Sequence, residues 1–248
     1  MTGIFVSKGM AVTIPHYSLR LNEAGEIESE SLALHIRFDV GPTWIQIGQR
    51  HLEAALLAKS HLQGVWLGTD EVAKARALEA EFEASMQAIV AVAIAWDAIY
   101  AVLRQHIVIP QSFAERWRRG QTARYIQVAE IVRRAFALKK NNADQVRNHL
   151  REIYRLRDLA VHPSGKIQAP ILHPDLNVGT EWRFVWFRAT NAEIAVSVSA
   201  AMLWELANGG KSRYPRVTEY QQSLAMRLND VFPQGPPSVP TAPPNSAK

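Results

Sequence analysis

The chain has 248 residues, and 48% of them are hydrophobic, which is enough to build a packed core. It contains no cysteine, which excludes disulfide bonds, a thiolate nucleophile and a cysteine-ligated zinc site. The formal net charge is +5, but Arg104 to Lys166 alone hold 14 Lys and Arg against 5 Asp and Glu, a local balance of +9 that leaves −4 for the rest. This basic central block indicates either a polyanionic partner such as nucleic acid or the solvated face of arginine-rich helices.

The sequence of the first forty or so residues has the pattern typical of β-strands. Gly25 lies near the end of a polar turn between two short β-prone runs, and Leu32 to Val40 alternates apolar and polar residues until Gly41-Pro42 ends the pattern. Residues 1–42 are therefore predicted to form a small antiparallel, β-rich appendage. The expected strands lie at Val12–Ile14, Tyr17–Leu21, Ile27–Ser29 and Leu32–Val40.

Residues 43–231 are predicted to form a helical bundle, because the composition becomes rich in alanine and apolar residues recur at helical spacing. A short basic turn is expected at Phe113–Arg119, a loop over 164–180, and a strand or clamp-like segment at Trp182–Phe187. The Pro-rich residues 232–248 are predicted to be a disordered tail. The expected helices are Gln49–Gln63, Glu71 to about His106, Ala123–Lys139, Asp144 to His162, Asn191–Ala207 and Tyr214–Val231.

The most apolar stretch, Ala84 to Leu103, carries one charge, Asp97. Its length raises the question of a membrane span, which we reject because an aspartate at mid-span costs about 3 kcal/mol on insertion scales. The stretch is better placed at the centre of the bundle. The first residues also lack a long apolar segment typical of a secretory signal, so we expect a cytoplasmic protein.

The helix expected to end at His162 carries an unusual charge. At 100° per residue, an apolar stripe forms that has Arg157 at its middle, at roughly 20° from Val146. A guanidinium on a buried face is costly unless it is paired, and Asp97 is the natural partner, so we predict an Asp97–Arg157 contact. The apolar members of the stripe are Val146, Leu150, Ile153, Tyr154, Ala160 and Val161.

The segment RDLAVH, from Arg157 to His162, resembles the R-x4–6-H signature of HEPN domains (higher eukaryotes and prokaryotes nucleotide-binding). As in that family, a polar residue, Asp158, follows the arginine, and the motif lies near the end of a late helix. The resemblance implies a HEPN-like antiparallel helical bundle over about 49–207. The β-rich start, the Trp182–Phe187 segment and the Pro-rich tail depart from the family pattern.

In its catalytic branch, the family resemblance implies a metal-independent endoribonuclease that acts as a homodimer without a cofactor, in a toxin or antiviral defence system. His162 would be the general acid or base, Arg157 would stabilise the phosphorane oxygens, and Asp158 would orient the imidazole. An antitoxin or another inhibitor protein is then an expected partner. The alternative is a non-catalytic module that binds nucleic acid or a protein, in which Arg157 is only a buried tie.

Three arginines, Arg147, Arg151 and Arg155, recur every four residues and form a basic flank beside the motif. They are candidates to bind an RNA backbone, with a solvated helix face as the alternative.

The remaining polar residues give weaker signals. No metal site is expected, since the spacing of His106, His149 and His173 is not that of ligands, and Ser197 and Ser199 lack a nucleophile-elbow context.

Overall fold

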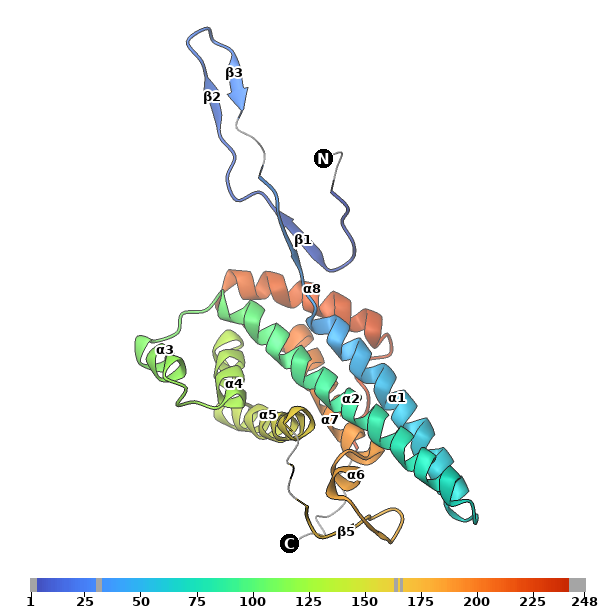
Figure 1. The fold of residues 1–248 in the computed structure, drawn as a ribbon. Helices are drawn as coiled ribbons and strands as arrows, with labels where there is room; N and C mark the ends of the chain where they lie inside the picture. Colours follow the sequence, from blue (N-terminus) through green and yellow to red (C-terminus); the bar gives the residue numbers. More distant parts are fainter. Residues whose placement is uncertain (1–3, 30–32, 163–164, 166, 241–248) are drawn as a thin grey trace. The chain divides into compact units, whose positions relative to one another are not determined.

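The computed structural model describes residues 4–29, 33–162, 165 and 167–240, and it is mainly helical. The described chain divides into two units, Met1–Val40 and Gly41–Lys248. The second unit contains all the helices (Figure 1). They are α1 (Gly41–Trp66), α2 (Glu71–Arg104), α3 (Gln111–Arg118), α4 (Arg124–Ala135), α5 (Lys140–Val161), α6 (Trp182–Trp186), α7 (Ala189–Gly209) and α8 (Pro215–Val231).

The first unit is a β-hairpin arm with two ladders. Strand β1 (Met10–Thr13) pairs with β4 (His35–Phe38), and β2 (Leu19–Leu21) pairs with β3 (Ile27–Ser29), both antiparallel. The paired residue numbers add to the same value in both ladders, so the ladders belong to one hairpin in a single register. Pro15, which has no N–H to donate, lies in the interruption between them.

The predicted strands are present in part. Strand β4 covers four residues, fewer than the predicted run; Ala33 and Leu34 are outside it, and Leu32 lies outside the described residues. The side chains of the arm are mostly exposed, including the apolar Leu21 at 73%. The alternating apolar and polar residues therefore predicted a strand in this region correctly. They did not predict burial correctly, because neither face of β4 is buried.

Helix α2 is the centre of the bundle, and α1, α4, α5 and α7 all pack against it. At Gly48 of α1 the two long helices approach so closely that an added Cβ would lie 2.9 Å from Val92 Cγ1 of α2. Among the described residues, α2 alone has the length and composition to cross a membrane, and 61% of its most apolar window is buried inside the bundle. Packing against four helices accounts for its apolar character.

Local signals explain where α2 and α7 begin. The Asp70 side chain accepts hydrogen bonds from the N–H groups of Val72 and Ala73, which caps the first turn of α2. At α7 the cap comes from another helix, because Glu81 Oε1 of α2 accepts from the N–H of Ala189 at 2.8 Å. Burial raises the pKa of Glu81, and the Ala189 N–H opposes that shift.

Several predicted elements were wrong in type or extent. Gly41 and Pro42 begin α1, eight residues before the predicted helix, because proline is well tolerated in the first turn. The expected basic turn is the helix α3. The segment expected to be a strand or a clamp at Trp182–Phe187 contains the helix α6, whose first turn is capped by Glu181 accepting from Arg183 N–H. Aromatic and β-branched residues favour strands, but this local cap and tertiary packing override that preference.

The loop predicted over 164–180 contains a short ladder between β5 (Ile171–Leu172) and β6 (Gly179–Thr180). The predicted tail begins one residue too early, since Phe232 is buried against the core just beyond α8. Residues 233–240 contain no helix or strand, and residues 241–248 lie outside the described part of the chain.

Candidate functional site

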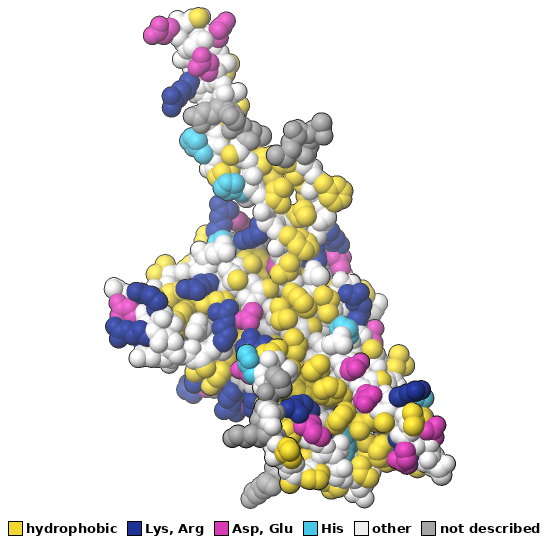
Figure 2. Space-filling model, in the orientation of Figure 1, with side chains coloured by type: hydrophobic (Ala, Val, Ile, Leu, Met, Phe, Trp, Pro, Cys, Tyr) yellow, Lys and Arg dark blue, Asp and Glu magenta, His cyan; other side chains and the backbone are white. Residues whose placement is uncertain are grey.

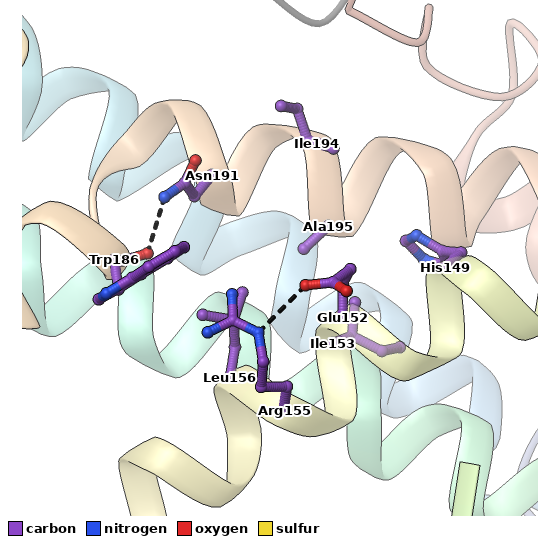
Figure 3. A pocket seen from close by; sticks show the side chains of 9 residues that line it. All are labelled: His149, Glu152, Ile153, Arg155, Leu156, Trp186, Asn191, Ile194 and Ala195. Atoms are coloured by element: carbon purple, nitrogen blue, oxygen red, sulfur yellow. Dashed lines mark hydrogen bonds and ion pairs between the residues drawn. The ribbon is translucent and has the colours of Figure 1, made fainter. Parts of the chain in front are cut away.

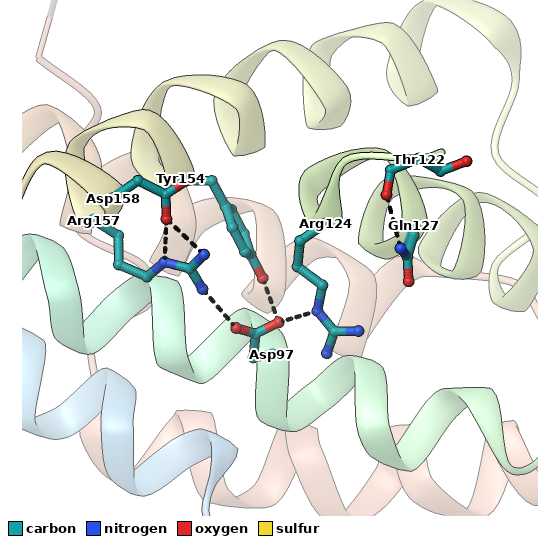
Figure 4. Close-up of polar contacts among 7 residues, drawn as sticks. All are labelled: Asp97, Thr122, Arg124, Gln127, Tyr154, Arg157 and Asp158. Atoms are coloured by element: carbon teal, nitrogen blue, oxygen red, sulfur yellow. Dashed lines mark hydrogen bonds and ion pairs between the residues drawn. The ribbon is translucent and has the colours of Figure 1, made fainter. Parts of the chain in front are cut away.

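The predicted contact between Asp97 and Arg157 is present. Arg157 Nη1 of α5 donates to Asp97 Oδ2 of α2 at 3.1 Å (Figure 4). Both side chains are largely enclosed, with exposed fractions of 26% for Asp97 and 23% for Arg157. The arginine on the apolar stripe of α5 and the single charge of the most apolar helix therefore neutralise each other.

Asp97 also has two partners that the sequence did not indicate. Its Oδ1 accepts from Arg124 Nε at 2.6 Å and from the Tyr154 hydroxyl at 2.7 Å. One carboxylate thus joins α2, α4 and α5 (Figure 4). Burial raises the pKa of the Tyr154 phenol, and the neighbouring Asp97 carboxylate raises it further, so the hydroxyl stays protonated and donates.

Local contacts fix the position of Arg124 at the first turn of α4. The side chain of Gln127 donates to the carbonyl of Thr122 at 2.9 Å, which ties the start of the helix to the segment before it. The guanidinium of Arg124 lies 3.9 Å from the ring centroid of Tyr100, a cation–π distance. Burial disfavours the charge of Arg124, but the hydrogen bond and ion pair with Asp97 outweigh it and raise the pKa of Arg124.

Arg157 lies between one enclosed and one exposed carboxylate. Its Nε and Nη2 donate to Asp158 Oδ1 at 3.0 and 2.7 Å, and the Asp158 side chain is 55% exposed. Three of the five guanidinium N–H groups are therefore taken, and within the described part of the chain one N–H on each terminal nitrogen has no acceptor. This arrangement places the guanidinium at the edge of the bundle rather than deep inside it.

The end of α5 differs from the predicted stripe in one respect. His162 caps the helix through its backbone N–H, which donates to the carbonyl of Asp158 at 2.9 Å, and its side chain is exposed. Val161, expected to be buried, is 51% exposed because the helix leaves the bundle at this point. Asp158, expected to orient the imidazole, instead uses Oδ1 for Arg157 and has Oδ2 without a protein partner among the described residues.

The three flanking arginines lie outward along α5, but they differ in their contacts. Arg151 and Arg155 both pair with Glu152, at 3.3 and 3.1 Å, whereas Arg147 is exposed and has no carboxylate partner in the described chain. Figure 2 shows Lys and Arg side chains gathered over the part of the bundle formed by α3, α4 and α5. The basic block of the sequence is therefore a surface feature of these helices.

A second polar cluster, which residue spacing did not predict, joins α2, α5 and α7. The buried Ser199 Oγ accepts from Trp96 Nε1 at 3.1 Å and lies 2.7 Å from His149 Nε2. Burial lowers the pKa of His149 to about 4, so its ring is neutral at neutral pH. No carboxylate is bonded to this His–Ser pair in the described structure, and Ser199 is fully enclosed, so the cluster is a tie between helices rather than a nucleophile.

A third polar group holds the segment before α7 against α1 and α2. His173 is buried, Asp175 pairs with Arg188 at 3.2 Å, and Lys59 donates to the Thr190 hydroxyl at 2.8 Å. Burial lowers the pKa of His173. Within the described ranges, no group of three or more His, Asp and Glu side chains is placed to hold a metal ion.

No family model, curated protein or solved structure matches this chain.

Proposed function

We propose that this chain is a metal-independent endoribonuclease of HEPN type that acts as a homodimer, with Arg157 and His162 as its catalytic residues. The observation that carries the proposal is the state of Arg157. Two carboxylates fix its guanidinium at the bundle edge, two of its N–H groups remain available, and an exposed histidine ends the same helix. The basic surface of α5 supports a polyanionic substrate.

The chemistry requires only side chains that two copies of this chain would supply. The ribose 2′-hydroxyl attacks the adjacent phosphorus, and its proton passes to a general base; the 5′-oxygen leaves with a proton from a general acid. This gives a 2′,3′-cyclic phosphate and a 5′-hydroxyl. His162 has an imidazole suited to one of these proton transfers, and a second copy of the chain supplies the other. The two free N–H groups of Arg157 stabilise the charge of the phosphorane oxygens.

The experiment compares RNA cleavage by the wild-type protein, His162→Ala and His61→Ala. His61 is an exposed histidine of α1, away from the motif, so it is a matched control. With a chelator present, we expect wild-type and His61→Ala to release cyclic-phosphate ends, and His162→Ala to lose at least about 100-fold in rate. Sedimentation of the same samples measures whether the protein is a dimer in solution. Intact RNA with the wild-type protein, or equal rates for all three, would contradict the proposal.

A non-catalytic RNA-binding module is the second candidate. It is favoured by the same ion pairs, because Asp97 and Asp158 together neutralise much of the positive charge that Arg157 would offer to a phosphate. In that case the wild-type protein binds RNA with an affinity that falls steeply with salt and leaves the RNA intact. If RNA neither binds nor is cut, both candidates fail.

A further inference from the structure

A cavity of about 180 Å³ lies between α5 and α7, beside the arginines of α5 (Figure 3). Its apolar part combines aliphatic side chains with the indole of Trp186, and its polar part is made by side chains of different charge. The lining residues are His149, Glu152, Ile153, Arg155, Leu156, Trp186, Asn191, Ile194 and Ala195.

One end of the cavity is an aromatic and cationic pair. The guanidinium carbon of Arg155 lies 4.3 Å from the ring centroid of Trp186, and the Trp186 side chain remains 39% exposed. Glu152 holds Arg155 in place through a hydrogen bond of 3.1 Å to its Nε. A flat indole beside a flat, fixed guanidinium is the kind of surface on which a nucleobase stacks.

Asn191 supplies a hydrogen-bond acceptor at the same end. Its Nδ2 donates to the carbonyls of Val185 and Trp186, at 3.2 and 3.0 Å, which uses both amide hydrogens. These two contacts fix the orientation of the amide, and its Oδ1 accepts no hydrogen bond from the described residues. A carbonyl oxygen accepts from an exocyclic amino group or a ring N–H.

The surroundings connect the cavity to the basic face of α5. Arg155 belongs to the same row of α5 as Arg147 and Arg151, so a ligand in the cavity lies beside one end of a row of cationic side chains. His149 lines the cavity as a neutral ring and adds no positive charge. An apolar protein side chain would use the aliphatic floor but leave Arg155, Glu152 and Asn191 facing an apolar group, which is unfavourable.

We propose that this cavity binds a single purine base, stacked beside Trp186 and Arg155, from an RNA strand whose phosphates lie along Arg147, Arg151 and Arg155. A purine offers two fused rings for stacking, one ring more than a pyrimidine. The inference rests on the proposed function in taking RNA as the ligand, but it does not require cleavage.

Calorimetric titration of the full chain with AMP and with UMP tests the proposal. We expect AMP to bind and UMP to bind more weakly, and Trp186→Leu to lower the AMP affinity about tenfold, the loss typical of one stacked base. Trp204→Leu is the matched control, because Trp204 lines a different cavity, near the end of α7, and should leave AMP binding unchanged. Arg155→Lys, at a partly buried position, keeps the positive charge but removes the planar guanidinium, and should reduce the preference for AMP over UMP.

The outcomes separate this inference from the cleavage proposal. Binding of AMP through Trp186 with RNA left intact supports the cavity and contradicts the nuclease. Cleaved RNA with no AMP binding, equal affinity for AMP and UMP, or unchanged affinity in both Trp186→Leu and Arg155→Lys overturns the cavity and leaves the nuclease standing. A melting curve for each variant shows that it is folded before it is compared.

Discussion

Asp97 Oδ2 and Arg157 Nη1 lie 3.1 Å apart although the two residues are separated by 60 positions in the chain. The contact joins the most apolar helix of the bundle to the helix that carries the candidate motif. Since Asp97 also accepts from Arg124 and Tyr154, removing it leaves two guanidinium groups and a phenol without their acceptor.

We expect Asp97→Ala to lower the free energy of unfolding by about 2–3 kcal/mol, because it leaves the partly enclosed Arg124 without a carboxylate and Arg157 with Asp158 alone. Urea unfolding of the purified protein measures this change. The control is Asp144→Ala, which removes an exposed ion pair with Lys140 and should cost less than about 0.5 kcal/mol. Equal losses in the two variants would show that the Asp97 network does not stabilise the bundle.

The substitution Arg157→Lys tests whether the planar guanidinium of Arg157, rather than its positive charge alone, is needed for RNA cleavage. Lysine keeps a positive charge near Asp97 but cannot hold Asp158 through two nitrogens, so we expect RNA cleavage to fall about 100-fold through loss of preorganised donors. The control is Arg133→Lys, since Arg133 also forms two hydrogen bonds to one carboxylate, that of Glu130. If both variants cut RNA at the wild-type rate, Arg157 is a structural tie and the non-catalytic module is favoured.

The buried His149 makes the free energy of unfolding depend on pH under acidic conditions. Its pKa is lowered from 6.5 to about 4 by burial, so between these values the unfolded chain binds a proton that the folded chain does not. Stability contributed in this way is complete above pH 6.5 and is lost as the pH falls toward 4, by up to about 3 kcal/mol. We expect His149→Gln to flatten the dependence of unfolding free energy on pH in this window.

Chemical unfolding at several pH values between 7 and 4 measures the slope for wild-type, His149→Gln and the exposed-site control His61→Gln. The control should keep the wild-type slope. A slope for His149→Gln as steep as that of the wild type would mean that other buried groups, such as His173, carry the acid sensitivity.

The outward arginines of α5 predict the salt dependence of RNA binding. Replacing Arg147 and Arg151 with Gln removes two phosphate contacts, and the slope of log affinity against log salt should become shallower by about 1.4 for single-stranded RNA. Fluorescence anisotropy with a labelled oligonucleotide measures the slope. Arg216→Gln, an exposed arginine of α8 paired with Glu219, is the control and should leave the slope unchanged; a double variant that matches the control would place RNA elsewhere.

How far the sequence predicts this structure depends on whether a signal is local. Asp97 and Arg157 could be paired in advance because each is a lone charge on an apolar stripe, and such charges require partners. Arg124 was missed because it begins a helix with many polar residues, where another arginine carries no information. The partner of His149 was missed for the opposite reason: Ser199 lies in a run of small residues whose facing neighbours depend on packing between helices.

The cavity was beyond sequence reasoning because its walls come from α5, α6 and α7, and α6 was predicted as a strand. The aromatic residues of that segment were noticed, but only the turn that returns the chain into α7 brings Trp186 beside Arg155. Tertiary contact, rather than local preference, created that pair.

The contact between Ser199 and His149 helps to fix the rotation of α5 about its own axis. His149 meets Ser199 on α7, and Arg157, eight residues later, meets Asp97 on α2, so α5 is fixed at two points about 12 Å apart along its axis. A slip of one residue would turn every side chain by about 100°, carrying Arg157 out of the bundle and Asp158 toward it. The two contacts therefore fix the rotation of α5 about its axis, and with it which side chains of the helix are exposed to solvent.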